Sequence, residues 1–180
     1  MLGFARDAQL EAEIFNDRLA EEARMIRQDE PSFFPVRGNL RHWVGIIMGR
    51  DLYEEAALPL EIIITRSYPF RPPRAFFLSF IYHPNISATP SVAKVDNTRY
   101  SRYQICVGTT GKDWVASSSL VDVIESIRIL LTLPNPLDPL NKEAARLMTR
   151  DPEKYTSKAL ISVKQNTWMR AAQICESLGR

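Results

Sequence analysis

Cysteine and histidine are scarce in this sequence, which limits the chemistry that the chain can perform. Only Cys106, Cys175, His42 and His83 occur among 180 residues, and their separations match no paired metal-ligand spacing. We therefore expect no metal site. Two cysteines in a chain without an apparent export signal indicate reduced thiols rather than a disulfide, so each thiol needs its own explanation.

Long apolar runs and an excess of one charge are also missing. No window reaches the roughly 18 uncharged apolar residues that a membrane helix needs. The first twenty residues include several charged side chains: Arg6, Asp7, Glu11, Glu13, Asp17 and Arg18. A net charge of +2 with 45% hydrophobic residues is typical of a globular protein. We expect no membrane span, no secretory signal, no nucleic-acid partner and a cytoplasmic location.

The first half of the chain changes from a helical to an extended pattern. Apolar residues three or four positions apart predict one stripe of a helix over residues 5–28: Ala8, Ala12, Phe15, Leu19, Ala23 and Ile26. Runs rich in aromatic and β-branched residues then predict four strands: residues 32–37, 41–48, 58–65 and 75–80. Their connections are too short for helical crossovers, which predicts an antiparallel meander.

The second half begins with a long polar loop and then becomes helical. Ser119 with Asp122 predicts a capped helix, and Asn141 can open a short one. Asp151-Pro152 predicts the start of an extended last helix that reaches about Leu178. No repeat or linker divides residues 1–180, so we expect a single domain. Its predicted class is α+β, with an N-terminal helix, a four-stranded antiparallel meander and C-terminal helices.

Two proline-rich stretches carry the most specific pattern. Residues 68–86 read Tyr-Pro-Phe-Arg-Pro-Pro-Arg-Ala-Phe-Phe-Leu-Ser-Phe-Ile-Tyr-His-Pro-Asn-Ile, and residues 134–140 read Pro-Asn-Pro-Leu-Asp-Pro-Leu. Ile105-Cys106 and Trp114 lie between them. The chain thus resembles the ubiquitin-conjugating enzyme family, whose members share a YPFxPP turn, an IYHPNI segment, an IC dipeptide, a downstream tryptophan and a PNPxDPL loop. The resemblance covers about residues 5–160 and is specific because all five motifs occur in family order.

This resemblance implies an acyltransferase with the family's fold. Such an enzyme accepts ubiquitin or a ubiquitin-like modifier from an activating enzyme as a thioester. It then transfers the modifier to a substrate lysine, alone or with a RING-type ligase. No cofactor is implied, because ATP is used by the activating enzyme. The sequence leaves open which modifier, activating enzyme, ligase and acceptor are involved.

By resemblance, Cys106 is the thiol that carries the modifier. A thiol suits this task because its thioester stays reactive toward amines, so one difficult transfer becomes two easier ones. The alternative is a buried cysteine that acts as a small apolar side chain.

Asn85 and Asp138 are the other two predicted catalytic residues, and each has a structural alternative. The Asn85 amide can donate a hydrogen bond to the oxyanion that forms when an amine attacks the thioester, or it can organise a loop. Asp138 can orient the incoming lysine, whose pKa near 10.4 leaves almost none of it neutral at pH 7. Alternatively, Asp138 bonds backbone amides in a proline-rich turn. We expect structural roles beside the site for His83, Pro84 and Tyr82.

Two neighbouring loops form the predicted partner-binding surface. By resemblance, Tyr68, Pro69 and Phe70 on one loop and Ala116 on the other dock activating enzymes and ligases. Core packing is the alternative, and we favour it for Trp114.

Three features depart from the family. By resemblance, the connection over residues 87–104 is about a dozen residues longer than usual, which predicts an active-site loop insertion. Its basic excess of Lys94, Arg99 and Arg102 over Asp96 could steer an acidic partner, or it could be an incidental part of a solvated loop. Ala116 replaces the family's usual proline, and the first helix, usually basic, is slightly acidic. Both changes predict an altered partner surface.

Two other functions compete with this interpretation. A non-catalytic relative on the same fold would bind the modifier without carrying it, but such proteins lack the cysteine that Cys106 provides. A cysteine protease needs a histidine free to act as a base, whereas His83 lies in a segment stiffened by Pro84. Both are weaker interpretations than a conjugating enzyme.

Overall fold

Helices cover both faces of an antiparallel sheet in the computed structural model, which describes residues 2–106 and 114–179. The helices are α1 (Leu2–Asp29), α3 (Leu120–Thr132), α4 (Lys142–Arg150), α5 (Pro152–Gln165) and α6 (Trp168–Gly179). Short 3-10 turns lie at Val36–Gly38 (η1) and Asp51–Tyr53 (η2). The strands are β1 (Phe34–Pro35), β2 (His42–Met48), β3 (Ala57–Ile63), β4 (Arg74–Phe77), β5 (Ser91–Val95) and β6 (Thr98–Gln104). The α+β prediction is confirmed.

The predicted meander is present as β1 to β4, and it is extended by two further strands. The sheet order is β1-β2-β3-β4-β6-β5, with every neighbouring pair antiparallel. The first strand is shorter than predicted: β1 ends at Pro35, where the chain turns into η1 with Arg37 in the left-handed region at φ 51°.

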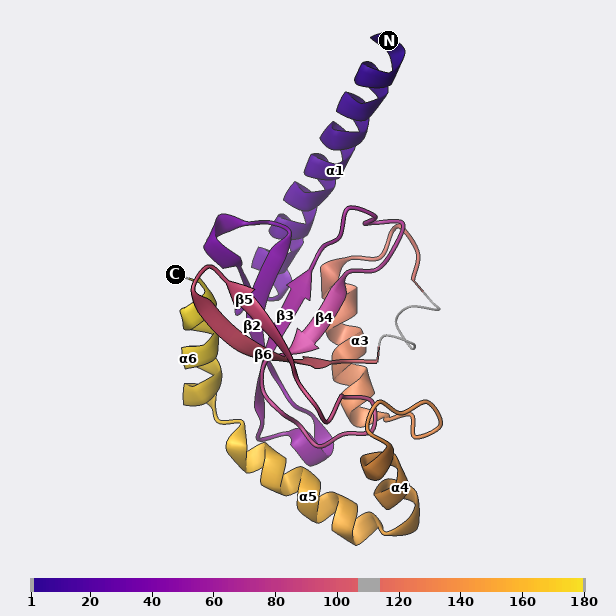
Figure 1. The fold of residues 1–180 in the computed structure, drawn as a ribbon, viewed down its shortest axis with the longest axis vertical. Coiled ribbons are helices and arrows are strands. Elements are labelled where there is room, and N and C mark those ends of the chain that lie inside the picture. The colour runs from indigo at the N-terminus through magenta and orange to yellow at the C-terminus, as the bar shows by residue number, and fades with distance from the viewer. Residues whose placement is uncertain (1, 107–113, 180) are drawn as a thin grey trace.

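The prediction of a polar loop over residues 87–104 is wrong, because most of this segment is the β5–β6 hairpin. Asp96 adopts φ 48° at the tight turn, a conformation that two-residue hairpin turns require and that aspartate tolerates. Only the end of β6 pairs with β4, through Phe76 with Gln104 and Phe77 with Tyr103. The rest of the hairpin crosses over the sheet (Figure 1).

One face of the sheet forms the main core. Alternate residues of β2 and β3 point to this inner face: Trp43, Ile47, Leu58, Leu60 and Ile62. The second half of α1 and the apolar side of α3 pack there, and α5 adds Ala159 and Val163. The first half of α1 extends beyond the body (Figure 1). Ala12 is exposed, so the predicted apolar stripe reaches the core only from Phe15 onward, and the Ala8 side chain lies outside the described ones.

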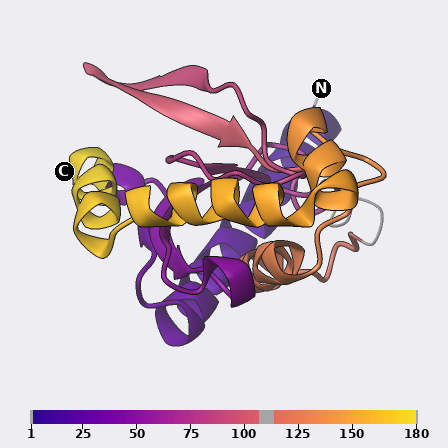
Figure 2. The ribbon, with the colours of Figure 1, turned by 90° about the horizontal axis from the view of Figure 1, so that it is seen from below.

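The opposite, outer face is covered by α6 and the hairpin. Val44 of β2 packs with Cys175 and Leu178 of α6, and Tyr100 of β6 joins the same cluster. Figure 2 shows the hairpin above the sheet, with α5 crossing the molecule in front.

The single last helix predicted from residue 151 to 178 is wrong, since it divides into α5 and α6. Asn166 ends α5: its side-chain amide donates to the carbonyls of Phe80 at 2.8 Å and Ser162 at 2.7 Å. Its own carbonyl accepts from the Ala57 N–H at 2.8 Å. The bonds to Phe80 and to Ala57 of β3 redirect the chain. The predicted helix starts at Ser119, Asn141 and Asp151 are confirmed by their side-chain caps.

None of the described helices is long and apolar enough to cross a membrane.

Candidate active site around Cys106

Cys106 follows directly after the sheet and is joined to the His83–Ile86 segment. Ile105 forms an isolated antiparallel bridge with Ile86, and the Cys106 N–H donates to the Asn85 carbonyl at 2.8 Å. The cysteine is half-buried and free. Its thiol is therefore placed at the end of a strand on backbone that is hydrogen-bonded to its neighbour.

Asn85 connects Cys106 to the 134–140 loop. Its side-chain Nδ2 donates to the carbonyls of Asn135 at 2.8 Å and Asp138 at 3.2 Å, and its Oδ1 accepts from the Asn135 N–H at 2.8 Å. Asn85 is buried, and both amide hydrogens are engaged in this arrangement. These bonds support the loop-organising role. As an oxyanion donor, Asn85 would have to exchange one of them.

His83 and Pro84 hold the same segment from behind. The buried His83 ring donates from Nε2 to the Leu130 carbonyl at 3.1 Å and accepts the Asn85 N–H on Nδ1 at 3.0 Å. Burial lowers the pKa of His83 to about 4, although the bond to Leu130 opposes this shift. A neutral ring with both nitrogens engaged supports a structural role rather than that of a base.

The neighbours of His83 attach the segment to the C-terminal helices. The Pro84 carbonyl accepts from the N–H of Asn141, the cap of α4, at 2.8 Å. The Tyr82 N–H donates to Ser162 of α5 at 3.0 Å. The sequence marks Asn141 only as a helix cap, because its bond to Pro84 joins residues far apart in the chain.

Asp138 lies in the exposed part of the 134–140 loop. Its carbonyl is held by Asn85, while its carboxylate is on an exposed residue. Leu137 beside it is also exposed. Cys106 and Asp138 are thus linked through opposite ends of one residue: the Asn85 carbonyl binds Cys106, and its side chain binds the Asp138 backbone.

The predicted partner loops meet, but they do not expose all the predicted residues. Trp114 donates from its indole N–H to the Pro69 carbonyl at 2.6 Å and packs against the core, as favoured above. Phe70 is 83% exposed, and Ala116 is exposed on the neighbouring loop. The Tyr68 side chain is buried, so its expected place on the contact surface is wrong. Its hydroxyl instead binds the Glu22 carboxylate.

The first helix exposes less acidic charge to solvent than its sequence suggests, because Glu22 is buried. Glu22 is fully buried; it pairs with Arg18 and accepts from the Leu120 N–H at the start of α3 at 2.8 Å. A carboxylate at a helix N-terminus is favourable because of the helix dipole. Glu22 therefore anchors α1 to α3 and does not contribute to a partner surface.

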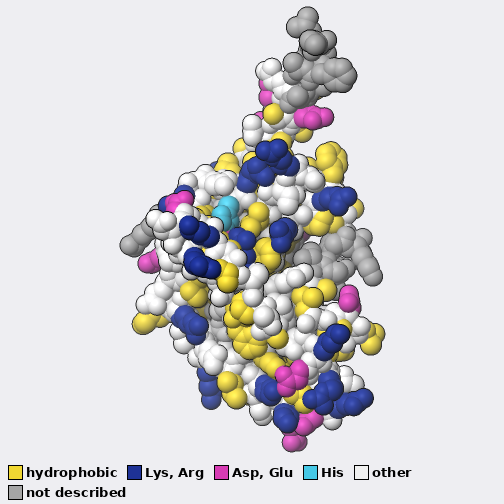
Figure 3. All heavy atoms as spheres, viewed as in Figure 1, with side chains coloured by type: hydrophobic (Ala, Val, Ile, Leu, Met, Phe, Trp, Pro, Cys, Tyr) yellow, Lys and Arg dark blue, Asp and Glu magenta, His cyan; other side chains and the backbone are white. Residues whose placement is uncertain are grey.

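The three basic residues of the hairpin also differ from one another. Arg102 is bound to the buried carboxylate of Glu61, which also accepts from Tyr100 at 2.6 Å and contacts His42 Nε2 at 2.6 Å. Lys94 and Arg99 are exposed. Figure 3 shows Lys and Arg side chains gathered on the face over which the hairpin lies. Any steering of an acidic partner must come from Lys94 and Arg99, because Arg102 anchors the hairpin.

The family model described as "Ubiquitin-conjugating enzyme" matches residues 18–163, most of the chain and the whole site. The chain belongs to this family. Among solved structures, it resembles one described as a ubiquitin conjugating enzyme from Plasmodium yoelii, with 26% identity and a TM-score of 0.70 over 83% of this chain and 93% of that one. It also resembles the E2 domain of a Toxoplasma gondii ubiquitin conjugating enzyme, with 27% identity and a TM-score of 0.71 over 84% of this chain and 98% of that one.

The ubiquitin-conjugating enzyme match includes the whole candidate site but not the last helix. The matched residues 18–163 include Asn85, Cys106 and Asp138, whereas α6 begins at Trp168, beyond the match. Cys175 therefore lies in a helix beyond the matched residues. It is 3% exposed, its thiol faces the Gly45 carbonyl at 3.6 Å, and burial raises its pKa to about 12. Such a thiol is a poor nucleophile at neutral pH.

Proposed function

We propose that this ubiquitin-conjugating enzyme carries ubiquitin or a ubiquitin-like modifier as a thioester on Cys106 and transfers it to a substrate lysine. The observation that carries the proposal is the connection through Asn85. The buried Asn85 links the segment that carries the Cys106 thiol to the 134–140 loop. The chain also belongs to the ubiquitin-conjugating enzyme family. The other cysteine is buried in α6, which leaves Cys106 as the nucleophile.

The two transfers proceed by addition and elimination at a carbonyl carbon. In the first, the Cys106 thiolate attacks the thioester between modifier and activating enzyme, a new C–S bond forms, and the activating enzyme's thiolate leaves. In the second, the lysine amine attacks the Cys106 thioester, loses a proton, and expels the Cys106 thiolate. The second step needs a neutral amine, for which the exposed Asp138 is our proposed orienting residue.

The docking part of the proposal concerns Phe70 and Ala116. An exposed phenylalanine beside a second loop held by the Trp114–Pro69 bond is a small apolar surface suited to a protein partner. We propose that the activating enzyme, and a RING-type ligase where one acts, contact this surface. We propose a cytoplasmic location, because the carrier function requires Cys106 to be a reduced thiol.

Reconstitution tests the carrier function. The enzyme is incubated with ATP and panels of modifiers and activating enzymes, and adducts are resolved with and without a thiol reductant. We expect a reducible adduct that Cys106→Ala abolishes and that the matched control Cys175→Ala retains. An adduct that persists in Cys106→Ala, or that forms on Cys175, would contradict the proposal.

Phe70→Ala tests the docking surface separately. We expect slower loading at limiting activating enzyme, with loading restored at high concentrations because only binding is weakened. Val92→Ala removes an exposed apolar side chain from the hairpin and serves as the control. Equal loading rates for both variants would contradict the assignment of Phe70.

A further inference from the structure

An ion pair of α1, Arg18 with Glu22, contacts both loops of the proposed docking surface. We refer to residues 67–71 and 114–118 as the docking loops. Arg18 donates from Nε to the Glu22 carboxylate at 2.9 Å. Glu22 is fully buried, and the Arg18 side chain is only 18% exposed. The pair is therefore enclosed between α1 and the loops, away from any partner bound outside.

Each docking loop reaches this ion pair through one polar group. The hydroxyl of Tyr68 donates to the Glu22 carboxylate and accepts from Arg18 Nη2 at 3.3 Å. The same Arg18 nitrogen donates to the carbonyl of Ser118 at 2.6 Å. The planar guanidinium holds several donors in fixed directions, so one side chain can bind both loops and the carboxylate.

These anchors lie close in sequence to the exposed residues of the docking surface. Phe70 is two residues after Tyr68, and the exposed Ala116 is two residues before Ser118. The indole bond described above joins the loops to each other, whereas the ion pair joins both of them to α1. The position of the exposed side chains thus depends on bonds made beneath them.

Bonds of this kind are suited to holding a binding surface in one arrangement. Hydrogen bonds to charged groups are stronger than neutral ones, and the low dielectric of a buried site strengthens them further. A surface that is ordered before its partner arrives binds more tightly, because no loop has to be ordered during association.

We propose that Arg18 and Glu22 are positioning residues for the loading of Cys106, because they hold the docking loops in the arrangement that the activating enzyme binds. The inference rests on the proposed docking surface and extends it to two residues that do not touch the partner. Cys106 is held by a separate bond to Asn85, so the thioester chemistry does not depend on this ion pair.

Two conservative variants each weaken one anchor. Tyr68→Phe removes only the hydroxyl: its ring can still pack against Trp114, whose centroid is 5.7 Å away. Glu22 keeps its bonds to Arg18 and to the Leu120 N–H, so no buried charge is left unpaired. Arg18→Lys keeps the positive charge but replaces the planar fork by a single nitrogen, which cannot reach all three groups equally well.

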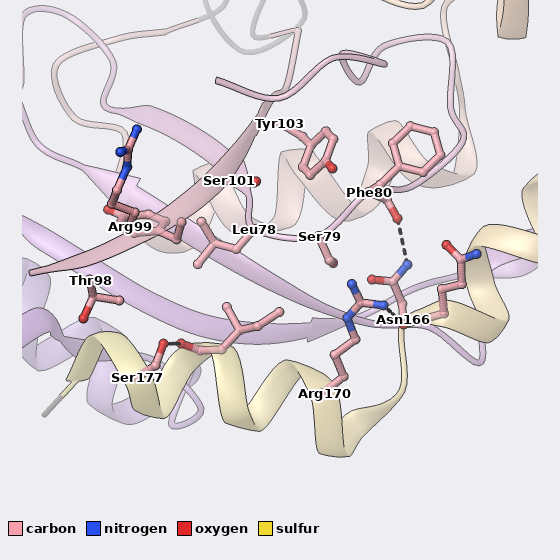
Figure 4. A pocket seen from close by; sticks show the side chains of 13 residues that line it. Leu78, Ser79, Phe80, Thr98, Arg99, Ser101, Tyr103, Asn166, Arg170 and Ser177 are labelled. Atoms are coloured by element: carbon pink, nitrogen blue, oxygen red, sulfur yellow. Dashed lines mark hydrogen bonds between the residues drawn. The ribbon is translucent and has the colours of Figure 1, made fainter. Parts of the chain in front are cut away.

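Tyr100 and Arg102 on the outer face provide matched controls. They bind the buried carboxylate of Glu61 as Tyr68 and Arg18 bind theirs. Tyr100 lines a pocket of about 310 Å³ between the hairpin and α6, shown in Figure 4. None of the described residues that line this pocket belongs to a docking loop. Tyr100→Phe and Arg102→Lys therefore make the same chemical changes away from the docking surface.

Amide hydrogen exchange tests the positioning on the full chain alone. Each docking loop is closed by a backbone bond of 2.9 Å: the Arg71 N–H donates to the Ser67 carbonyl, and the Ser118 N–H donates to the Val115 carbonyl. We expect exchange of these two amides at least about tenfold faster in Tyr68→Phe or Arg18→Lys than in the parent, and unchanged exchange in the outer-face controls. Parent-like exchange in both docking-loop variants would overturn the inference.

Loading kinetics then test whether this positioning matters to the partner. With a charged activating enzyme from the reconstitution above, Tyr68→Phe should raise KM on the order of threefold to tenfold at unchanged kcat. Discharge of the loaded enzyme to free lysine should also stay unchanged. Tyr100→Phe should alter neither quantity. A fall in kcat or in discharge at an unchanged KM would indicate a general structural role and contradict the proposal.

A double variant separates failure of the inference from failure of the docking surface. In the Phe70→Ala background, Tyr68→Phe should have little further effect on KM, because its anchor acts through Phe70. Equal fold increases in both backgrounds would overturn the positioning role. A raised KM in Phe70→Ala with an unchanged KM in Tyr68→Phe would overturn this inference alone, whereas an unchanged KM in Phe70→Ala would contradict the docking surface itself.

Discussion

The two cysteines occupy opposite kinds of environment. Cys106 is half-buried at the end of the sheet, on backbone bonded to Asn85, whose polar side chain holds the next loop. Cys175 is enclosed by Val36, Val44 and Leu178 on the outer face. We refer to residues 83–86, 104–106 and 135–141 as the Cys106 region, and to residues 91–103 with α6 as the outer-face region.

The comparison shows how one fold leaves one thiol accessible and encloses the other. The Cys106 region is held mainly by hydrogen bonds between loops, which leave the thiol accessible. The outer-face region is held by apolar packing and one buried charge cluster at Glu61. Loops positioned by a rigid scaffold commonly carry function, whereas packed segments support it. The following predictions test this contrast, from the largest effect to the smallest.

Alkylation should separate the two thiols most strongly. With a pKa raised by burial to about 12, only about one Cys175 thiol in ten thousand is ionised at pH 8, and the reagent must also reach a buried atom. We expect iodoacetamide to label Cys106 at least about a thousandfold faster than Cys175, measured by peptide mass spectrometry. In denaturant the two rates should converge. Comparable labelling in the native enzyme would remove the contrast.

Two buried asparagines provide a matched test of the regions. If Asn85 stabilises the oxyanion, Asn85→Ala should load Cys106 almost normally and discharge to free lysine about 100- to 1000-fold more slowly. If it only organises the loop, loading and discharge should fall together. Asn166→Ala also removes a buried amide that donates to two carbonyls, but in the outer-face region. That variant should lose stability and keep its discharge rate per folded molecule.

Arg102→Ala should destabilise the hairpin without removing the chemistry. Burial alone would raise the pKa of Glu61, but hydrogen bonds from His42, Arg102 and Tyr100 outweigh it and hold the pKa below its ordinary value. Removing the arginine leaves a buried carboxylate without its main counter-charge, at a cost of about 3 kcal/mol in urea unfolding. Arg50→Ala, whose pair with Glu125 is nearly half-exposed, should cost less than about 1 kcal/mol. Equal costs would indicate that Glu61 is not the anchor.

Acid should weaken the Cys106 region through His83. Because burial lowers the folded-state pKa to about 4, the unfolded chain takes up this proton first as the pH falls below about 6.5. The His83 contribution to stability is therefore complete above pH 6.5 and is lost toward pH 4, a decrease of about 3 kcal/mol at roughly 1.4 kcal/mol per unit. His83→Gln should flatten the pH dependence of the free energy of unfolding between about pH 6.5 and pH 4. An NMR titration midpoint for His83 above 6 would refute it.

The smallest effect is expected from the exposed charges of the hairpin. Lys94→Ser with Arg99→Ser should slow loading on the order of threefold at low salt if these residues steer an acidic partner, and not at all at high salt. The pair Arg150→Ser and Lys164→Ser removes two exposed charges elsewhere and serves as the control. Identical salt dependence in both double variants would show that the hairpin charges are incidental.

Local signals in the sequence were sufficient for most of the helices and for the meander. Ser119 with Asp122, Asn141 and Asp151 each mark a helix start through a side chain that caps backbone only three residues away. The hairpin had such a signal too: Asp96-Asn97 lies between Val92, Val95, Thr98 and Tyr100, a pattern typical of a tight turn between strands. Its polar composition led to the loop prediction.

The candidate site, like the fold, could be predicted only in part from the sequence. Motif resemblance predicted Cys106, Asn85 and Asp138 by position, while the connection among them depends on residues about 50 positions apart, such as Asn85 with Asn135. Tyr68, by contrast, was predicted to contact a partner, yet it is buried and its hydroxyl bonds to Glu22 of α1. A buried acid of this kind is indistinguishable in sequence from the exposed acids around it.

The sequence by itself determined the family, the order of most elements and the identity of the candidate nucleophile, because these depend on short motifs and local periodicity. Only the tertiary structure decided where the added segments lie. Asn166 interrupts a sequence that would continue as helix because it bonds Phe80 and Ala57, residues distant in the chain. Glu61 retains its charge in the interior because Arg102 reaches it from the hairpin. Such long-range partners are chosen by the packed fold, since no local pattern encodes which distant group will satisfy a buried polar atom.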